Sequence, residues 1–193
     1  MSMSRLAYGV ALLAMVPSLV FAQARANTRQ GFWVGVGLGL GSTGTDCSSC
    51  TTDRTSGMSG YARLGGTISR SLLVGVESNG WVHSEGGVDE TLGFGSVIGI
   101  WYPSATGGLF LKVGLGAMSY KAADGVDELT ATAAAGSFGL GYDFRVGRNM
   151  SITPFLNSLA TSNTDFKFNG ETIATNAAFK VNLVQVGVGL TWH

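Results

Sequence analysis

The sequence predicts an all-β protein, an eight-stranded antiparallel up-and-down transmembrane β-barrel. Two segments, Phe32–Leu40 and Val184–His193, indicate this fold most clearly, because large apolar side chains alternate in both with glycine or polar residues. A soluble sheet places polar side chains on its solvated face, and glycine does not supply them. Large apolar side chains on one face and small ones on the other are typical of a narrow barrel wrapped by lipid.

The composition favours a single membrane domain and excludes several other classes. The 193 residues are enough for one domain or two very small ones. Charged residues make up only 12% of the chain, glycine occurs 30 times and mean hydropathy is +0.27. With 3 proline residues and no regular glycine spacing, collagen and proline-rich disorder are excluded. The formal net charge is zero, so we expect no nucleic-acid partner.

Residues 1–24 are predicted to be a cleaved signal peptide, which leaves residues 25–193 as the barrel domain. Arg5 provides the positive start and Leu6–Phe21 the apolar segment. Two cleavage sites follow, Val20-Phe21-Ala22 and Ala22-Gln23-Ala24. The alternative is a retained anchor helix, but spanning a bilayer needs about 20 apolar residues, and tyrosine, glycine, proline and serine interrupt this run. The mature chain is therefore expected outside the cytoplasm.

The first four predicted strands are Phe32–Gly41, Gly57–Ser69, Ser71–His83 and Glu90–Tyr102. Each shows the two-residue alternation of a strand with two different faces. In the first three, glycine and polar residues share one face, which we assign to the lumen. The same rule assigns the two faces of the fourth strand: Leu92, Phe94, Ile98, Ile100 and Tyr102 to the lipid, and Gly93, Gly95, Gly99 and Trp101 to the lumen.

The last four predicted strands are Gly107–Lys121, Leu129–Val146, Met150–Ala160 and Val184–His193. Pro154 lies within the seventh strand, and proline normally weakens a strand because it has no N–H to donate. The even number of strands allows an antiparallel barrel to close. Closure removes the unpaired edges that lipid could not satisfy.

The connections between these strands alternate in length. Three are short (residues 69–71, 103–107 and 147–149), and four are longer and more polar (residues 41–56, 84–89, 122–128 and 161–179). Short periplasmic turns that alternate with longer outer loops are typical of outer-membrane barrels. Four aromatic residues at the short-turn or terminal ends of their strands predict an aromatic girdle at one membrane boundary: Phe32, Tyr102, Phe144 and Trp192.

Eight polar residues on the predicted lumen face form the sharpest candidate site: Arg63, Glu77, Asn79, Lys112, Asp143, Arg145, Asn157 and Gln185. A hairpin that turns about Arg70 places Arg63 opposite Glu77, and we expect an ion pair there. Lys112 and Asp143 are the second expected pair. Such a network either fills a barrel too narrow for a pore or lines a conduit. We favour the filled lumen because five aromatic residues are assigned to the same face: Trp33, Trp81, Trp101, Phe110 and Phe155.

Cys47 and Cys50 are the only cysteines, and we predict that they form a small disulfide in an exposed loop. A thioredoxin-like redox pair and half a zinc site are the alternatives. Neither fits, because no βαβ pattern surrounds the cysteines and His83 and His193 are the only histidines. We predict no metal or cofactor site.

An enzyme would have to use the polar cluster His83, Ser84, Glu85 and Asp89. Adjacent residues of a strand project to opposite faces, so His83 and Ser84 are poorly placed to act as base and nucleophile. We therefore predict no catalytic residue and interpret the cluster as the polar entry to a loop.

Four features occur together in this chain: the signal peptide, the segment Gly31-Phe-Trp-Val-Gly-Val-Gly-Leu-Gly, eight amphipathic strands and the C-terminal Val-Gly-Val-Gly-Leu-Thr-Trp-His. In this combination the mature chain resembles the small outer-membrane β-barrel proteins of the OmpA-transmembrane-domain and OmpX-like group. The resemblance implies the cell outer membrane, contact with outer-membrane lipids and recognition by the barrel-assembly machinery. Members usually end in Phe, whereas this chain ends in Trp192-His193.

The group includes structural proteins, adhesins, small channels and a few lipid-modifying enzymes, so membership alone does not decide function. We expect a structural or surface-interaction protein whose interior is plugged by side chains and whose long loops are available to an extracellular ligand. The alternative is a narrow porin-like channel for small solutes. A lipid-modifying outer-membrane enzyme, in the manner of the lipid A deacylases with their His/Ser site, is the third class.

Overall fold

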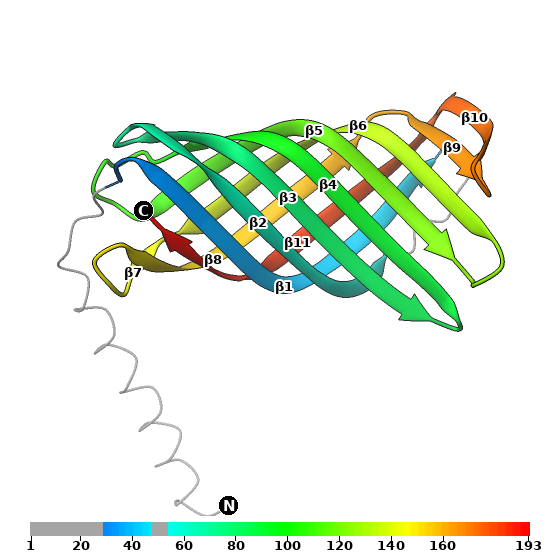
Figure 1. Ribbon diagram of the computed structural model, residues 1–193, viewed down its shortest axis with the longest axis horizontal. Coiled ribbons are helices and arrows are strands. Elements are labelled where there is room, and N and C mark those ends of the chain that lie inside the picture. Colours follow the sequence, from blue (N-terminus) through cyan, green and yellow to red (C-terminus); the bar gives the residue numbers. More distant parts are fainter. Residues whose placement is uncertain (1–28, 48–53) are drawn as a thin grey trace, which may run out of the picture.

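The computed structural model describes residues 29–47 and 54–193, which form a closed antiparallel β-barrel (Figure 1). Its wall strands are β1 (Phe32–Cys47), β2 (Thr55–Ser69), β3 (Leu72–Glu85), β4 (Val88–Trp101), β5 (Leu109–Ala123), β6 (Glu128–Tyr142), β8 (Met150–Thr161) and β11 (Phe179–Trp192). The sheet closes because β11 pairs with β1 and β6 pairs with β8. The predicted eight-stranded antiparallel barrel is confirmed.

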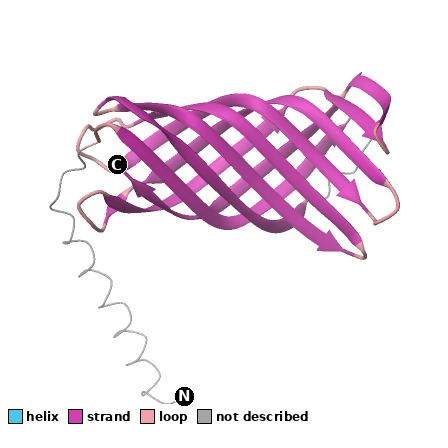
Figure 2. Ribbon diagram, viewed as in Figure 1, coloured by secondary structure: helices cyan, strands magenta, loops and turns pink. Residues whose placement is uncertain are grey.

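The described part of the chain consists of strands and the turns between them (Figure 2). It contains no helix long and apolar enough to cross a membrane. The predicted signal peptide lies outside the described residues. The predicted disulfide does as well, since neither Cys50 nor the side chain of Cys47 is described.

The strands are longer than predicted, with 12 to 16 residues in the wall strands against an expectation of about ten. The extra length lies mainly at the end opposite the C-terminus and the start of β1 (Figure 1). Two predicted loops shrink to tight turns as a result: Gly86 and Gly87 connect β3 to β4, both with positive φ, and residues 124–127 connect β5 to β6. Following the barrel rule, we call this the outer end and the opposite end the periplasmic end.

The long loop predicted for residues 161–179 is wrong, because it contains a hairpin of β9 (Thr164–Phe168) and β10 (Glu171–Ala177). Asn169 and Gly170 form its turn with φ of 47° and 85°, which matches the Asn-Gly preference of tight hairpin turns. β9 pairs with the outer part of β6, at Leu129–Thr132, where β8 has already ended. The hairpin thus continues the wall toward the outer end.

Seven wall strands place their faces as predicted, but the assignment of β4 is wrong. Leu92, Phe94, Ile98, Ile100 and Tyr102, which follows the strand, are buried in the lumen, whereas Val97 and Trp101 are exposed. The glycines of β4 therefore face outward. In register with β3, the lumen-facing side of β4 lies beside Trp81, Asn79 and Glu77, where large side chains fill the interior. A Cβ on the lumen glycines would meet a side chain, as at Gly37 and Gly141, or the backbone of the adjacent strand, as at Gly39, whereas nothing lies within 4 Å of one on Gly93 or Gly95.

The aromatic residues predicted for the girdle lie at one end of the wall, except that one of the four is replaced by its neighbour in the chain. Phe32, Phe144 and Trp192 are exposed at the periplasmic end of the wall, and Trp101 takes the place of the buried Tyr102. Pro154 is accommodated at a break in the wall. β6 pairs with β8 as far as Phe155, and β7 (Phe144–Arg145) resumes the pairing at Ile152, so the missing N–H of Pro154 falls between the two ladders.

The orientation of β4 generates a test that uses two of its apolar residues. Phe94 is 1% exposed and Val97 is 67% exposed. Phe94→Ala should lower the free energy of unfolding by about 3–5 kcal/mol because it leaves a cavity in the lumen, whereas Val97→Ala should cost about 1 kcal/mol. Urea unfolding in phospholipid vesicles measures both. A larger loss of unfolding free energy for Val97→Ala than for Phe94→Ala would show that β4 has the orientation predicted from the sequence.

Candidate functional site

A layer of buried polar side chains crosses the middle of the lumen, with an ion pair at its centre. Lys112 Nζ on β5 donates to Glu77 Oε1 on β3, and both side chains are almost completely buried. Asn79 Nδ2 donates to the same carboxylate oxygen at 2.8 Å. Removing one partner of a buried ion pair leaves an uncompensated charge, and Lys112 and Asn79 together compensate the Glu77 carboxylate through its Oε1 atom.

Arg63 lies opposite Glu77 in the register of β2 and β3, as predicted, but the predicted ion pair between them is wrong. Arg63 Nη2 donates instead to Thr191 Oγ1 at 3.3 Å. Its central guanidinium carbon lies 4.8, 5.1 and 5.9 Å from three ring centroids, those of Tyr61, Phe110 and Trp33. The faces of aromatic rings attract a cation, so an aromatic cage surrounds this buried charge.

The predicted pair of Lys112 with Asp143 is also wrong, because Lys112 pairs with Glu77 and Asp143 lies nearer the periplasmic end with other partners. Tyr102 Oη donates to its Oδ2 and Thr153 Oγ1 donates to its Oδ1, each at 2.7 Å. The Nε2 of His193 lies 3.4 Å from Oδ2. Three residues that sequence reasoning did not select thus surround the buried carboxylate.

The remaining predicted residues lie in two places. Asn157 and Gln185 are in register on β8 and β11, both buried, and Asn157 Nδ2 donates to Gln185 Oε1 at 3.4 Å. Arg145 is only half-buried in β7, where its Nε donates to the Gly147 carbonyl at 3.0 Å. The fold therefore brings seven of the eight predicted residues into the lumen and leaves Arg145 at the periplasmic turn.

Arg29 closes the periplasmic end and was not predicted as a site residue. Its side chain is completely buried, and its guanidinium donates to the backbone carbonyls of Arg70, Ala105 and Gly107. These carbonyls belong to two different periplasmic turns. The guanidinium carbon also lies 3.3 Å from the ring centroid of Tyr102. Gly31, between Arg29 and β1, has a φ of 75°, a left-handed backbone conformation that favours glycine.

Several buried polar atoms in the middle of the lumen have no partner among the described residues: Glu77 Oε2, Asn79 Oδ1, Ser96 Oγ, Ser137 Oγ and Gln185 Nε2. Buried water normally satisfies such atoms. Their position between the apolar outer half and the Arg29 seal indicates a hydrated compartment inside the barrel.

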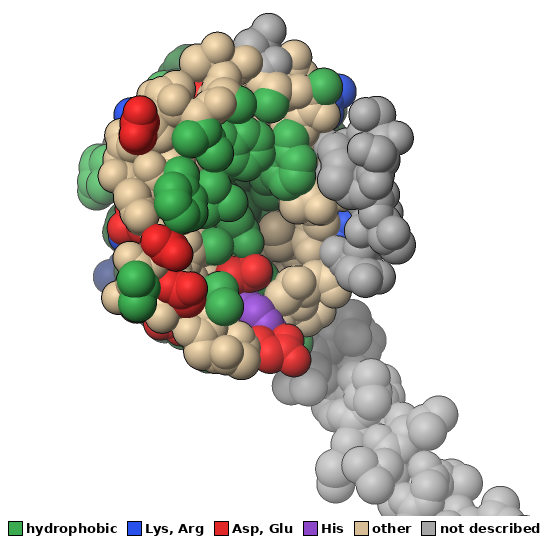
Figure 3. Space-filling view, turned by 90° about the vertical axis from the view of Figure 1, so that its right-hand side faces the viewer, with side chains coloured by type: hydrophobic (Ala, Val, Ile, Leu, Met, Phe, Trp, Pro, Cys, Tyr) green, Lys and Arg blue, Asp and Glu red, His purple; other side chains and the backbone are tan. Residues whose placement is uncertain are grey.

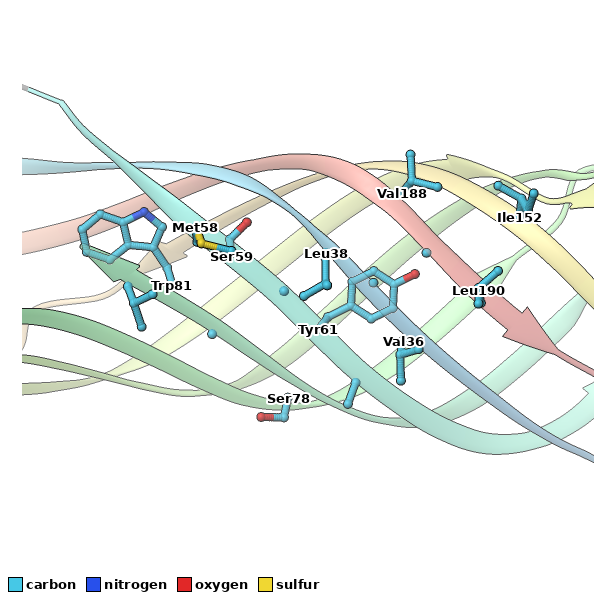
Figure 4. Close-up of a pocket in the computed structure, with 16 residues that line it drawn as sticks. Val36, Leu38, Met58, Ser59, Tyr61, Ser78, Trp81, Ile152, Val188 and Leu190 are labelled. Carbon is cyan, nitrogen blue, oxygen red and sulfur yellow. The ribbon is translucent and has the colours of Figure 1, made fainter. Parts of the chain in front are cut away.

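A groove of about 870 Å³ lies on the outward face of β11, β1, β2 and β3. Its exposed apolar side chains include Val36, Leu38, Met58, Val188 and Leu190 (Figure 4). Residues of this kind on the outside of a membrane barrel contact acyl chains. We assign the groove to the lipid contact of the wall.

His83 and Ser84 have different partners, as their neighbouring positions in β3 predict. His83 Nε2 lies 3.3 Å from Glu85 Oε2, while Ser84 Oγ donates to Asp89 Oδ1 at 2.6 Å. A hydroxyl that already donates to a carboxylate is not poised against the imidazole. The cluster is the polar base of the β3–β4 turn.

The ion-pair assignment can be tested by exchanging partners. Glu77→Ala should lower the free energy of unfolding by about 3–5 kcal/mol, because it leaves Lys112 buried and uncompensated. Glu77→Leu with Lys112→Met should recover most of this loss in urea unfolding. Glu77→Leu with Arg63→Met is the matched control and should not recover it. If only the control pair recovered the stability, Glu77 would be paired with Arg63 and not with Lys112.

The Arg29 seal generates a second test. Hydrogen bonds from a charged donor contribute about 1.5–3 kcal/mol each, so Arg29→Ala should destabilise the barrel by about 2 kcal/mol after partial rehydration of the turns. Arg29→Lys should be intermediate, because an ammonium group lacks the planar fork that reaches two turns. Both variants are compared with the parent in urea unfolding. Equal stability of all three would show that the Arg29 contacts do not hold the turns.

Comparisons with family models and with curated proteins gave no match for this chain. Solved structures do match. Neisserial surface protein A has a TM-score of 0.61 at 15% identity, with 84% of this chain and 97% of that chain covered. Ail, the attachment invasion locus protein of Yersinia pestis, has a TM-score of 0.50 at 14% identity, with 84% and 99% covered.

A second structure of Ail, in complex with the heparin analogue sucrose octasulfate, has a TM-score of 0.51 at 12% identity and covers 84% of this chain and 100% of that chain. Identities this low show the shared fold alone. The chain has the fold of the small eight-stranded outer-membrane barrels, and we place it in the outer membrane.

Proposed function

We propose that this chain is a structural or surface-interaction protein of the outer membrane whose lumen is closed by its own side chains. The observation that supports this function is closure at three levels along the barrel. An apolar layer fills the lumen below the mouth, the polar layer around Glu77 and Lys112 fills the middle, and Arg29 seals the periplasmic end.

The apolar layer is the strongest of these barriers. Its members are all at most 6% exposed and come from six wall strands: Trp81, Leu92, Phe94, Met118, Ala135, Leu159, Val181 and Leu183. Trp81 Nε1 donates to the carbonyl of Gly41 at 3.1 Å, which holds the indole across the lumen. A hydrated ion that entered this layer would lose its water without gaining polar contacts.

An interaction role is supported by the outer end, where the wall strands and the β9–β10 hairpin extend beyond the length that a membrane requires. Ail, a barrel of similar fold, was solved in complex with a heparin analogue, so such a barrel can hold a ligand. The partners that we propose are outer-membrane lipids along the wall, the assembly machinery during insertion, and a ligand at the outer end.

One observation favours the narrow channel as a second candidate. The unpartnered polar atoms of Ser96, Ser137 and Gln185 provide water sites in mid-lumen. For this compartment to conduct, both the apolar layer and the Arg29 seal would have to open. The closed lumen is therefore the better supported function.

Conductance across a planar bilayer separates the two functions. Refolded parent protein should give no steady openings. Arg29→Ala should also remain closed, because the apolar layer still blocks the outer half. Steady, ion-selective openings of the parent, with a selectivity that changes in Glu77→Gln, would overturn the closed lumen and establish the channel.

A further inference from the structure

The outer end of the barrel has a polar outward row that marks where the lipid contact stops. Thr91, Lys121, Thr130 and Lys167 lie in register on β4, β5, β6 and β9. Below this row the outward side chains of β4 and β5 are apolar or small, whereas the charged Asp165 lies one outward position below Lys167 on β9. On β4 and β5 the row therefore marks the outer limit of the lipid contact.

Four apolar side chains are nevertheless exposed at the outer end: Val88, Val126 and Phe168 beyond this row, and Ile173 on β10, next to the residue that pairs with Lys167. Val126, at the tip of the β5–β6 turn, is 88% exposed, and Ile173 on β10 is 60% exposed. Neither lipid nor a core covers them. Apolar groups gathered on one aqueous surface mark an interaction site more often than a structural need.

The mouth of the barrel is hollow and has an apolar wall. Figure 3 shows this end of the molecule, with hydrophobic side chains inside the hollow and carboxylates along its left and lower sides. Phe166 and Phe179 pack edge to face with their centroids 5.2 Å apart, and Phe179 and Tyr120 pack against the buried apolar layer. A side chain that enters the mouth would meet these aromatic rings, with His83 and Glu90 in register on the lumen side of β3 and β4 beside them.

The hairpins around the mouth are acidic. The β3–β4 turn carries Glu85, Asp89 and Glu90 and no basic residue other than His83. The β5–β6 turn carries Asp124, Asp127 and Glu128, and β9 and β10 add Asp165 and Glu171. The described basic residues at this end are fewer: Arg54, Lys121, Lys167 and Lys180.

Two of the rim carboxylates have local contacts that favour their charged form. The backbone N–H groups of Asp127 and Val126 lower the pKa of the exposed Asp124 carboxyl. A hydrogen bond from Lys121 lowers the pKa of the half-buried Glu128.

The periplasmic end has the opposite charge. Its turns carry Arg29, Arg70, Arg145 and Arg148, and among the described residues the only carboxylate near them is the buried Asp143. The chain as a whole is neutral, so the acidic outer end reflects a separation of charge along the barrel and not an acidic composition.

We propose that the outer end docks a cationic amphipathic peptide segment of a partner protein. The apolar side chains of that segment enter the aromatic mouth and pack on Val126 and Ile173, and its lysine or arginine side chains face the rim carboxylates. Complementary charge selects such a partner and rejects polyanions. This inference rests on the proposed surface-interaction function and names its partner class.

The test uses the full mature barrel in phosphatidylcholine nanodiscs, with empty nanodiscs as the blank. The probe is a synthetic peptide of alternating lysine and leucine. Three comparison ligands vary one property each: a glutamate–leucine peptide, a lysine–serine peptide and heparin. We expect the lysine–leucine peptide to bind tightest and its affinity to fall about tenfold between low and high salt, because the contacts are exposed charges.

Two variants and one control address the surface itself. Glu85→Lys with Glu171→Lys reverses two rim charges, and Val126→Ser with Ile173→Ser removes the apolar tips; each should weaken the peptide about tenfold. Val146→Ser is the matched control, since Val146 is 51% exposed but lies at the periplasmic end. It should leave binding unchanged. Circular dichroism of each variant confirms that the barrel has folded.

Tighter binding of heparin or of the glutamate–leucine peptide would overturn the cationic partner class and leave the surface-interaction function standing. Peptide binding that is unaffected by the rim and tip variants, or equally weakened by Val146→Ser, would overturn the site. Steady conductance of the parent in planar bilayers would overturn the proposed function itself, whatever the peptides do.

Discussion

Closure of a narrow wall is the constraint on which the rest of this structure depends. In lipid no water is available to backbone N–H and C=O groups, so every strand has to pair on both sides. The β1–β11 and β6–β8 ladders complete that pairing. Eight strands leave room for little more than side chains, and the residues that face inward must therefore fill the lumen and satisfy one another.

The buried charges follow from this constraint. Glu77 and Lys112 neutralise each other, Arg63 is held by aromatic rings, and Asp143 is held by hydroxyl groups. Each solution depends on a neighbour that only the closed wall supplies. The charges in turn connect strands that are not adjacent, since Glu77 on β3 reaches Lys112 on β5 across β4. The same contacts therefore fill the lumen and hold the strands in place.

The alternation of side chains was sufficient to predict the barrel, the strand count and seven of the eight strand faces, because a period of two is a local property. The face of β4 was not predictable by the same rule. Both of its faces suit a narrow barrel, and only the neighbouring Trp81 and Asn79 decide between them. The Asn169-Gly170 turn carried a readable hairpin signal that the assignment of a long loop overlooked.

The ion pairs and the Arg29 seal depend on information that the sequence pattern does not contain. Register places Arg63 opposite Glu77, but Lys112 lies in register with Ile100, so its bond to Glu77 runs diagonally across β4. Whether a side chain can contact a partner diagonally across a strand depends on both the stagger of the strands and the length of the side chain. Arg29 precedes the first strand, and its contacts with two turns exist only after the barrel has closed.

The outer end differs from the membrane-spanning part of the wall in the side chains that face outward. This difference connects the fold to the proposed function. Within lipid the outward face is apolar and polar groups are kept in the lumen. At the row of Thr91 and Lys121 the outward face becomes polar, and directly below this row the apolar layer fills the lumen beneath the outer turns. That layer gives the outer hairpins a rigid base without lipid. Because the base is supplied from within, side chains at the tips such as Val126 contribute little to the wall and are free to serve recognition.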